Sequence, residues 1–359
     1  MTTDEDVARW RLRSQRLVRP HASSVAEVVG HLLGVQAENP RQSEWALAAR
    51  TATPARADVG ALLAEGVLVR THVLRSTWHY VLADDVGWLL DLTSPRVVAT
   101  VDQQLRVLGL EGRALERASS VVVETLAAQP DSTRAELAVA LQEAGVETGG
   151  QRAMLLLGWL ELGQVVCSGR PREGEHTYAL LADRVPSPRR LEREEALAEL
   201  ALRYVTGHGP ATERDLAYWA TVTVTDVRRG LAAVRDRLES FEHDGRTYWH
   251  LPGQRPPRGA GTPGAHLLQI LDEMYRGYQD SRWVLDAAGL LAKGREATTG
   301  MALVGGQVVA GMRRTVGASE VVFDLAPHRP LSRPEVEALE QAARRYAAYL
   351  GLGARLALP

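Results

Sequence analysis

The strongest constraint on the fold is an order of secondary-structure elements that occurs twice along the chain. The first occurrence begins at Asp131, where residues 131–141 predict a helix and residues 154–162 predict a second helix after a glycine-containing turn. Two short runs rich in β-forming residues follow at 165–169 and 176–180, with a loop of Arg and Gly between them. This segment is therefore predicted to form helix, turn, helix and β-hairpin.

The same order returns further along the chain. Residues 208–219 and 224–234 predict two helices, and residues 238–251 predict a hairpin around Asp244-Gly245, a dipeptide that favours tight hairpin turns. Helix, turn, helix and hairpin in this order are typical of a winged-helix domain. The two segments therefore predict tandem winged-helix units, repeated in architecture more than in sequence.

The two ends of the chain add further elements. Near the start, residues 25–35 predict a helix that Ser24 caps and Gly34 ends, and residues 67–82 predict a pair of strands flanked by helices near 59–64 and 84–92. Near the end we expect three strands and a closing helix, at 301–303, 308–314, 321–325 and 333–350.

Together these patterns predict a mainly helical α+β protein. A chain of 359 residues is long enough for several units. We expect a first winged-helix unit, two further winged-helix units and a C-terminal α/β region of β-hairpin and helix, with the boundaries 1–110, 111–190, 191–255 and 256–359.

Composition excludes several classes of function. The formal net charge is −2, so a role in binding nucleic acid must depend on local basic patches. The histidines lack H-x-x-x-H spacing and Cys167 is the one cysteine, so we predict neither a metal site nor a disulfide. The N-terminus does not resemble a signal peptide and no run of about 18 apolar residues occurs, so we expect a cytoplasmic protein that does not enter a membrane.

One motif is typical of dinucleotide binding, but its context is not. Residues 259–264 match G-x-G-x-x-G, yet they follow a segment of Pro and Arg instead of a buried strand. Pro263 also removes an amide that a phosphate cradle needs. A linker over 251–264 is the better interpretation.

Arginines occupy the predicted hairpins. Arg170 and Arg172 lie in the loop of the first hairpin, and Arg313 and Arg314 end a strand of the C-terminal region. Arginines on a wing can reach phosphates or a narrow minor groove of DNA, whereas in an ordinary loop they are only solvated. The pattern supports both interpretations equally.

The segment from Gly34 to Pro40 carries the most information about chemistry. Because Pro40 disfavours the α region for the residue before it, we expect Gln36 and Glu38 on extended chain, where alternate side chains point the same way. A carboxylate just after a helix C-terminus meets the negative end of the helix dipole, which hints at a use for Glu38. On these residues alone, the simpler interpretation of an exposed carboxylate beside an amide has the greater weight.

Three short motifs in this order resemble the AlkZ-like bacterial DNA glycosylases. They are residues 34–38 (Gly-Val-Gln-Ala-Glu), 74–79 (Leu-Arg-Ser-Thr-Trp-His) and 277–282 (Gly-Tyr-Gln-Asp-Ser-Arg). The resemblance implies three winged-helix units around a concave DNA-binding channel, and removal of alkylated purines, including bulky adducts and cross-links. The family's catalytic motif is Gln, a hydrophobic residue and Gln, with Asp at the third position in a sister branch that resembles YcaQ. Here that position is Glu38.

The chemistry that the resemblance implies needs no metal and no organic cofactor. Purines alkylated at N7 or N3 are good leaving groups, so hydrolysis needs a positioned water and an acceptor for its proton. We expect Glu38 to accept that proton and to stabilise the developing charge on the sugar, while the Gln36 amide orients the water.

Other candidates for contacts with substrate or DNA carry less weight. Thr77 and His79 support the site or contact a phosphate if the strand pair packs on the first helix, although a structural His is an equal alternative. Trp45 would stack on an exposed base, but a core Trp is the simpler interpretation. The resemblance alone suggests four more residues: Arg75, Tyr278, Asp280 and Arg282.

The sequence thus predicts a monofunctional glycosylase that acts as a monomer on duplex DNA carrying alkylated purines. Two alternatives stay open. One is a winged-helix regulator that binds DNA without chemistry, and the other is an inactive relative that sequesters an adduct or a toxic metabolite.

Overall fold

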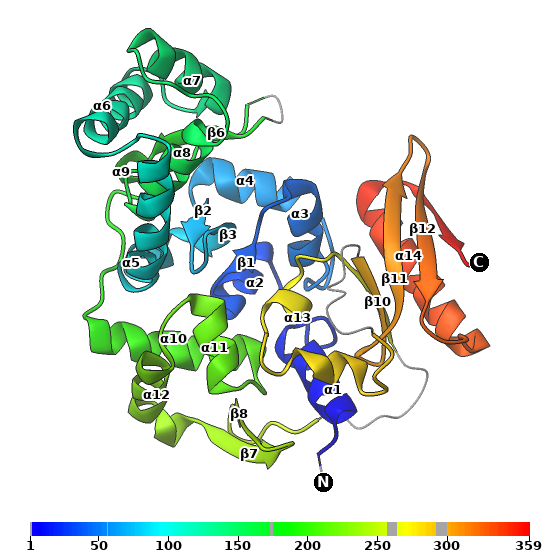
Figure 1. Ribbon diagram of the computed structural model, residues 1–359. Coiled ribbons are helices and arrows are strands. Elements are labelled where there is room, and N and C mark those ends of the chain that lie inside the picture. The colour runs from blue at the N-terminus through cyan, green and yellow to red at the C-terminus, as the bar shows by residue number, and fades with distance from the viewer. Residues whose placement is uncertain (1, 56, 173–174, 257–263, 292–299) are drawn as a thin grey trace. The chain divides into compact units, whose positions relative to one another are not determined.

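The protein is described by a computed structural model, in which the chain separates into two compact units. The described residues are 2–55, 57–172, 175–256, 264–291 and 300–359 (Figure 1). Unit 1 comprises Met1–Arg56, Ala201–Trp219 and Leu231–Pro359, and unit 2 comprises Ala57–Leu200 and Ala220–Gly230. Most of the G-x-G-x-x-G motif, including Pro263, lies outside the described residues.

The N-terminal part of unit 1 contains three helices and a short strand. They are α1 (Asp4–Ser14), α2 (Val25–Leu32), β1 (Val35–Gln36) and α3 (Pro40–Ala48). Ser24 caps α2 as predicted, by accepting a hydrogen bond from the Glu27 amide at 3.1 Å. The predicted end at Gly34 is wrong, because α2 ends at Leu32. The next residue, Leu33, is the C-cap and adopts φ 67°, which turns the chain.

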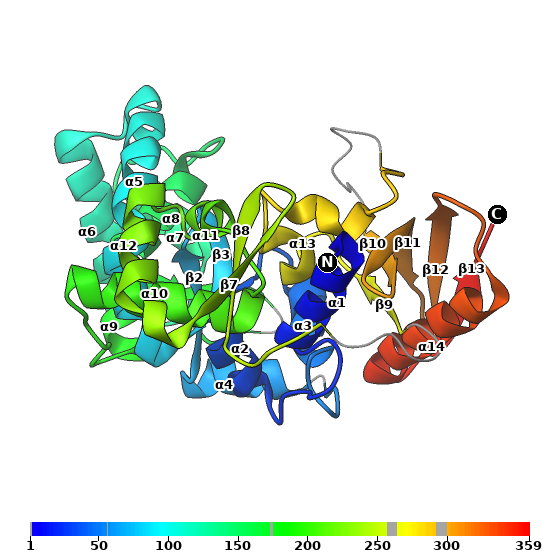
Figure 2. The same ribbon diagram turned by 90° about the horizontal axis from the view of Figure 1, so that it is seen from below.

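The C-terminal part of unit 1 is a five-stranded sheet covered by one long helix. The strand order is β13-β12-β11-β10-β9, with β12 and β13 parallel and the other neighbours antiparallel. Figures 1 and 2 show α14 lying along one face of these strands. The elements are β9 (Ala265–Leu268), β10 (Gly300–Val304), β11 (Gln307–Val316), β12 (Glu320–Pro327), α14 (Arg333–Leu350) and β13 (Gly353–Ala357).

The middle of the chain supplies the remaining elements of unit 1. Asp244 and Gly245 take positive φ, as the tight turn of the predicted hairpin requires. The core of this unit joins α1 and α3 to the five-stranded sheet and α14. The elements here are the end of α10 (Arg193–His208), α11 (Glu213–Ala220), η1 (Arg235–Arg237), β7 (Glu239–His243), β8 (Arg246–His250), α13 (Glu273–Arg276) and η2 (Arg282–Asp286).

Unit 2 is mostly helical, with two small groups of antiparallel strands. β2 pairs with β3, and β6 lies between β4 and β5. A hydrophobic core of this unit lies between the helices α5, α6, α7 and α8 and the strand pair β5–β6, whose bounds follow. The elements are α4 (Ala57–Glu65), β2 (Leu68–Val73), β3 (Thr77–Leu82), α5 (Ala83–Val107), α6 (Gly112–Ala128), β4 (Ser132–Thr133), α7 (Arg134–Glu143), α8 (Arg152–Leu162), β5 (Val166–Ser168), β6 (Thr177–Leu180), α9 (Leu181–Arg184) and most of α12 (Val224–Ala233).

The prediction of a mainly helical α+β protein is confirmed, and both predicted runs of helix, helix and hairpin are present. Several elements were not predicted, among them α1, α6, β9 and β13. The division into four regions stays a prediction, since compactness separates the chain into two units instead. No helix within the described residues has the length and apolarity that a membrane span requires.

Candidate active site

The Gln36 segment is fixed in unit 1 by the elements on both sides of it. Before it, α2 packs closely on α10: a Cβ added to Gly207 would lie 2.6 Å from the His31 carbonyl oxygen, so a larger residue does not fit there. After it, Pro40 opens α3 at a position where the missing amide hydrogen costs nothing. The chain between these helices is short, which limits the directions that Gln36 can take.

A buried carboxylate holds the backbone of this segment. The Gln36 amide donates to Glu273 Oε1 at 3.1 Å, and Trp219 Nε1 donates to Glu273 Oε2 at 2.9 Å. His208 Nε2 lies 3.3 Å from the same Oε2 atom. Glu273 has no exposed surface, so these contacts replace the water that a carboxylate otherwise needs. Hydrogen bonds to a charged acceptor are stronger than neutral ones, and we conclude that Glu273 anchors the backbone at Gln36.

A second buried acid lies next to this anchor. Asp272 accepts two hydrogen bonds from Arg50, at 2.7 and 3.0 Å, and both side chains are almost completely buried. Arg50 also donates to Gln15 Oε1 at 2.7 Å, and Gln15 Nε2 donates to the Glu273 carbonyl at 3.1 Å. The bidentate pair caps α13 as well, because Asp272 Oδ1 accepts from the Met274 amide. This network fixes the segment that carries Glu273.

Gln36 is one of the residues that line a small cavity. This cavity offers the centre of a water molecule about 10 Å³, which is enough for roughly one water. Gln269 Nε2 is buried there and has no hydrogen-bond partner within the described residues. The lining residues are Gln36, Asn39, Gln42, Ser43, Ala46, Gln269, Leu271 and Asp272.

Glu38 differs from Gln36 in its surroundings. Gln36 is 6% exposed and lies in β1, whereas Glu38 is partly exposed and lies in the bend that leads into α3. Glu38 does not line the small cavity, although it takes part in other interactions. The expectation that both side chains face one pocket therefore stays a prediction.

Comparisons with known proteins identify the family of this chain. A family model described as "DNA glycosylase AlkZ-like" matches residues 29–349, which include all the predicted site residues. The chain belongs to the AlkZ-like family of DNA glycosylases. The prediction of a DNA glycosylase is thereby confirmed at the level of the family.

Two further matches are to AlkZ of Streptomyces sahachiroi, one by sequence and one by fold. The chain is 26% identical over 361 residues to a Streptomyces sahachiroi protein described as an interstrand DNA cross-link repair glycosylase, and the match covers 96% of this chain and 95% of the relative. The solved structure of the Streptomyces sahachiroi DNA glycosylase AlkZ superposes with a TM-score of 0.77 at 22% identity, over 99% of each chain. The second match shows a shared fold along the whole length.

In the motif at 277–282 of this AlkZ-like chain Tyr278 is internal, which corrects its predicted contact with DNA, whereas Asp280 and Arg282 are half-buried and their contacts with DNA stay predictions. Tyr278 is completely buried and its hydroxyl donates to the His208 carbonyl at 2.7 Å. Asp280 accepts from Thr212 Oγ1 at 3.0 Å and lies 3.4 Å from Arg246 Nε. Arg282 Nε donates to two carbonyls, those of Tyr275 and Tyr278. The motif braces α13, which carries Glu273.

Close packing around Gly277 supports the same conclusion. A Cβ at this position would lie 2.6 Å from the Glu273 carbonyl and 2.8 Å from His208 Cδ2. The Gly277 carbonyl also accepts a hydrogen bond from the Tyr204 hydroxyl at 2.7 Å. We conclude that Gly277 allows the motif to approach the Glu273–His208 contact.

Trp45 is a core residue and does not stack on a base, as the simpler interpretation of the sequence held. It is 5% exposed and packs edge-on against Tyr346 of α14, with ring centroids 4.9 Å apart. A second contact joins it to Tyr349 at 5.2 Å. Its indole face is therefore occupied by the protein itself.

Three predicted residues of the AlkZ-like motif at 74–79 lie together in unit 2. His79 is completely buried, with Nδ1 2.9 Å from the Thr77 carbonyl and Nε2 3.2 Å from Arg75. Together the two contacts fit a neutral imidazole that donates from Nδ1 and accepts at Nε2. Thr77 Oγ1 has no hydrogen-bond partner within the described chain. Because this hairpin belongs to unit 2, its expected position beside Gln36 stays a prediction.

The predicted hairpin arginines have different surroundings. Arg170 and Arg172 are exposed in the β5–β6 loop and pair with Asp131 at 3.6 Å and Glu136 at 2.6 Å. Arg313 is exposed on β11, but the neighbouring Arg314 donates to the Tyr346 hydroxyl and lies over its ring. Arg314 therefore packs on α14 and is half-buried, so its role in DNA binding stays a prediction, whereas Arg313 is exposed.

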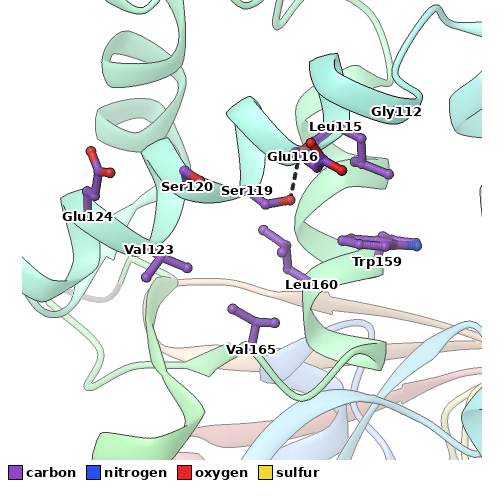
Figure 3. Close-up of a pocket in the computed structure, with 10 residues that line it drawn as sticks. All are labelled: Gly112, Leu115, Glu116, Ser119, Ser120, Val123, Glu124, Trp159, Leu160 and Val165. Carbon is purple, nitrogen blue, oxygen red and sulfur yellow. Dashed lines mark hydrogen bonds between the residues drawn. The ribbon is translucent and has the colours of Figure 1, made fainter.

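A larger hollow in unit 2 of this glycosylase lacks the character of a nucleic-acid site. It measures about 660 Å³ and lies between α6 and α8 (Figure 3). Leu115, Val123 and Trp159 make much of its lining apolar, and its charged side chains are Glu116 and Glu124. Two carboxylates without a cation repel a phosphate backbone.

Sequence reasoning missed the residues that support Gln36. Glu273, Asp272 and Gln269 lie more than two hundred residues from it along the chain, and no local pattern links them to it. The one available signal was the motif at 277–282, which directly follows α13. That motif marked the right region but not the role.

Proposed function

We propose that this protein is a monofunctional DNA glycosylase that hydrolyses the N-glycosidic bond of alkylated purines in duplex DNA. The observation that carries the proposal is the anchored Gln36 segment. Its backbone is bound to buried Glu273, Gln36 lines a small cavity, and partly exposed Glu38 follows two positions later. A glutamine with an anchored backbone and a partly exposed glutamate two positions later suit a hydrolytic site better than a surface without catalytic function.

The chemistry assigns a distinct task to each side chain. Alkylation places a positive charge on the purine, so the base leaves without a general acid, and the sugar becomes electron-deficient. Glu38 accepts the proton of the attacking water and stabilises the positive sugar. The Gln36 amide orients that water. A second carboxylate, as in sugar hydrolases, is unnecessary because the leaving group is already activated, and no cofactor takes part.

The fold supplies the means of holding duplex DNA. We infer that the two runs of helix, helix and hairpin, together with the β2–β3 region, are winged-helix units around a concave channel. Exposed Arg170, Arg172 and Arg313 are then in positions to contact phosphates. The relative described as a cross-link repair glycosylase supports bulky adducts and cross-links as substrates. Several units in one chain allow a monomer to act.

The test is release of a base from damaged DNA. The wild-type protein is incubated with a duplex that carries N7-alkylguanine, and free base and abasic sites are measured. Loss of the general base in Glu38→Gln is expected to lower the single-turnover rate by about 10²–10⁴-fold. Glu5→Gln is the matched control, because Glu5 is an exposed acid on α1 of the same unit.

The outcomes separate the proposal from its alternatives. Binding without release by the wild-type protein indicates a regulator or a sequestering relative, and titration with a free alkylating metabolite tells those two apart. Equal release by wild type and Glu38→Gln removes the proposed role of Glu38 while leaving the glycosylase activity in place.

A further inference from the structure

A second cavity of unit 1 lies outside the Gln36 segment and has a basic lining. It measures about 640 Å³ and is formed by α1, the loop that follows it, His31 at the end of α2, α10 and the segment after β8. The lining residues are Trp10, Arg13, Ser14, Arg16, Pro20, His31, Thr206, Leu251, Gly253, Gln254, Arg255 and Pro256.

The charged residues of this lining, which we call the arginine cavity, are all cations. It contains Arg13, Arg16 and Arg255 and no carboxylate. Arg13 and Arg255 are exposed and form no ion pair within the described residues, whereas Arg16 lies 3.1 Å from Glu27. The cavity therefore keeps an excess of positive charge after its internal pairing.

His31 does not add to that charge. Its Nε2 lies 2.6 Å from the Ser14 carbonyl, an arrangement in which a ring N–H donates. Burial lowers the pKa of His31 below its usual value, so the imidazole is neutral at physiological pH. The positive charge of the cavity comes from guanidinium groups, which bind phosphate oxygens through pairs of N–H donors.

A buried hydroxyl also lines the arginine cavity. Ser14 Oγ belongs to a residue that is 6% exposed, and it has no hydrogen-bond partner within the described chain. A buried polar atom without a partner is costly, and a ligand that accepts its hydrogen removes that cost. Beside it, Trp10 is fixed by donation to Gln254 Oε1 at 3.2 Å and by stacking on Phe241. The wall of the cavity is therefore preorganised.

We propose that the arginine cavity is a phosphate-binding site. Arg13 and Arg255 bind the oxygens from the open side, and the Ser14 hydroxyl donates from the buried side. The volume admits a whole nucleotide unit. The phosphate belongs either to the DNA backbone or to a free phosphate ester. The inference goes beyond the proposed hydrolysis, because it concerns binding of undamaged DNA or of phosphate alone.

The first arm of the test measures binding to an undamaged duplex as a function of salt. The variant Arg13→Gln/Arg255→Gln removes both unpaired guanidinium groups while keeping most of their stems. If a backbone phosphate occupies the cavity, the slope of log K against log[salt] becomes shallower by about 0.9 for one lost phosphate contact. The control is Arg333→Gln, which removes an exposed arginine of α14 in the same unit.

The second arm measures thermal stability in phosphate and in chloride at equal ionic strength. If the cavity binds a free phosphate, phosphate raises the melting temperature of the wild type, and the rise disappears in the double variant. Ser14→Ala leaves the charge unchanged and is expected to reduce the same rise. Melting in chloride checks that each variant folds.

Each result decides the proposal. A shallower slope of log K against log[salt] in the double variant, with no such change in Arg333→Gln, assigns the cavity to the DNA backbone. An unchanged slope with loss of the phosphate effect assigns it to a free phosphate ester. The proposal is overturned if neither property changes, or if Arg333→Gln changes both as much as the double variant does. Base release from damaged DNA tests the glycosylase proposal separately.

Discussion

Two arginine–carboxylate pairs, one in each unit of this protein, have opposite surroundings. In unit 1, Arg50 is completely buried, forms two hydrogen bonds with Asp272 and donates to Gln15 as well. In unit 2, Arg172 is 47% exposed in the β5–β6 loop and pairs with Glu136, which lies on the surface. Both are close arginine–carboxylate pairs, but only the first is sheltered from water and salt.

The difference separates arginines that hold the fold from arginines that are available to a ligand. A buried pair cannot lose one partner without leaving an unpaired charge in the interior. An exposed pair contributes little, and its carboxylate can be replaced by a phosphate oxygen at small cost. A motif rich in Arg is therefore a better indication of a DNA-binding surface where the guanidinium group is exposed, which favours Arg172 over the half-buried Arg314.

The largest expected effect is that of Asp272→Ala. Arg50 would remain buried without its partner, and we expect a loss of about 3–5 kcal/mol in the free energy of unfolding. Urea denaturation followed by circular dichroism measures it, with Arg172→Ala as the exposed counterpart and little change expected there. Equal losses of unfolding free energy in the two variants would show that burial does not distinguish the two arginine pairs.

A smaller effect on stability, with a specific effect on catalysis, is expected for Glu273→Gln. Glu273 accepts hydrogen bonds from the Gln36 amide and from Trp219 through two oxygens, whereas a glutamine has only one acceptor oxygen. We therefore expect the free energy of unfolding to fall by about 1–3 kcal/mol. We also expect a lower kcat for base release with an unchanged KM for DNA. Glu161→Gln is the matched control, because Glu161 is an equally buried acid in unit 2. If Glu161→Gln lowers kcat as much as Glu273→Gln does, Glu273 has no special role at the site.

The two units are also expected to share a sensitivity to acid through half-buried histidines. Burial lowers the pKa of His266 to about 4 in unit 1 and that of His176 to about 3 in unit 2. The unfolded state then binds the extra proton, so stability falls as pH decreases below the ordinary histidine value of about 6.5. Between pH 7 and 5, His176→Gln and His266→Gln should each flatten this decrease. A decrease as steep as that of the wild type in both variants would assign it to other groups.

The smallest effect is expected for Arg172→Ala. Hydrogen bonds from Arg172 and Thr133 lower the pKa of its partner Glu136 to about 2. Glu136 therefore stays ionised and solvated. The melting temperature should hardly change, whereas the salt dependence of duplex binding becomes weaker by one phosphate contact. Binding isotherms at several salt concentrations measure this, and an unchanged slope would remove Arg172 from the DNA-binding surface.

Elements with strong local signals could be predicted from the sequence. The helix α14 begins at Arg333, the predicted residue, after a capping box at Ser332, and the strands expected at 301–303 and 308–314 are present as β10 and β11. The strands β9 and β13 were missed, since each is short and lies at an edge of the sheet, where pairing with a distant strand decides its structure. Leu33 was missed because a left-handed leucine has no signature in sequence.

The candidate site could be located but not completed. Gln36 and Glu38 were recognised from a short local motif, and the segment that follows α2 lies where the motif predicted. Tyr278 was placed in the right region with the wrong role, because a short motif does not reveal whether its residues face solvent or the interior. The contact between Gln36 and Glu273 joins distant parts of the chain, and only the folded structure reveals it.

The anchor at Gln36 is made through a peptide N–H, which every amino acid except proline possesses. Any residue other than proline at position 36 could therefore keep this contact with Glu273, and its side chain would start from the same fixed backbone.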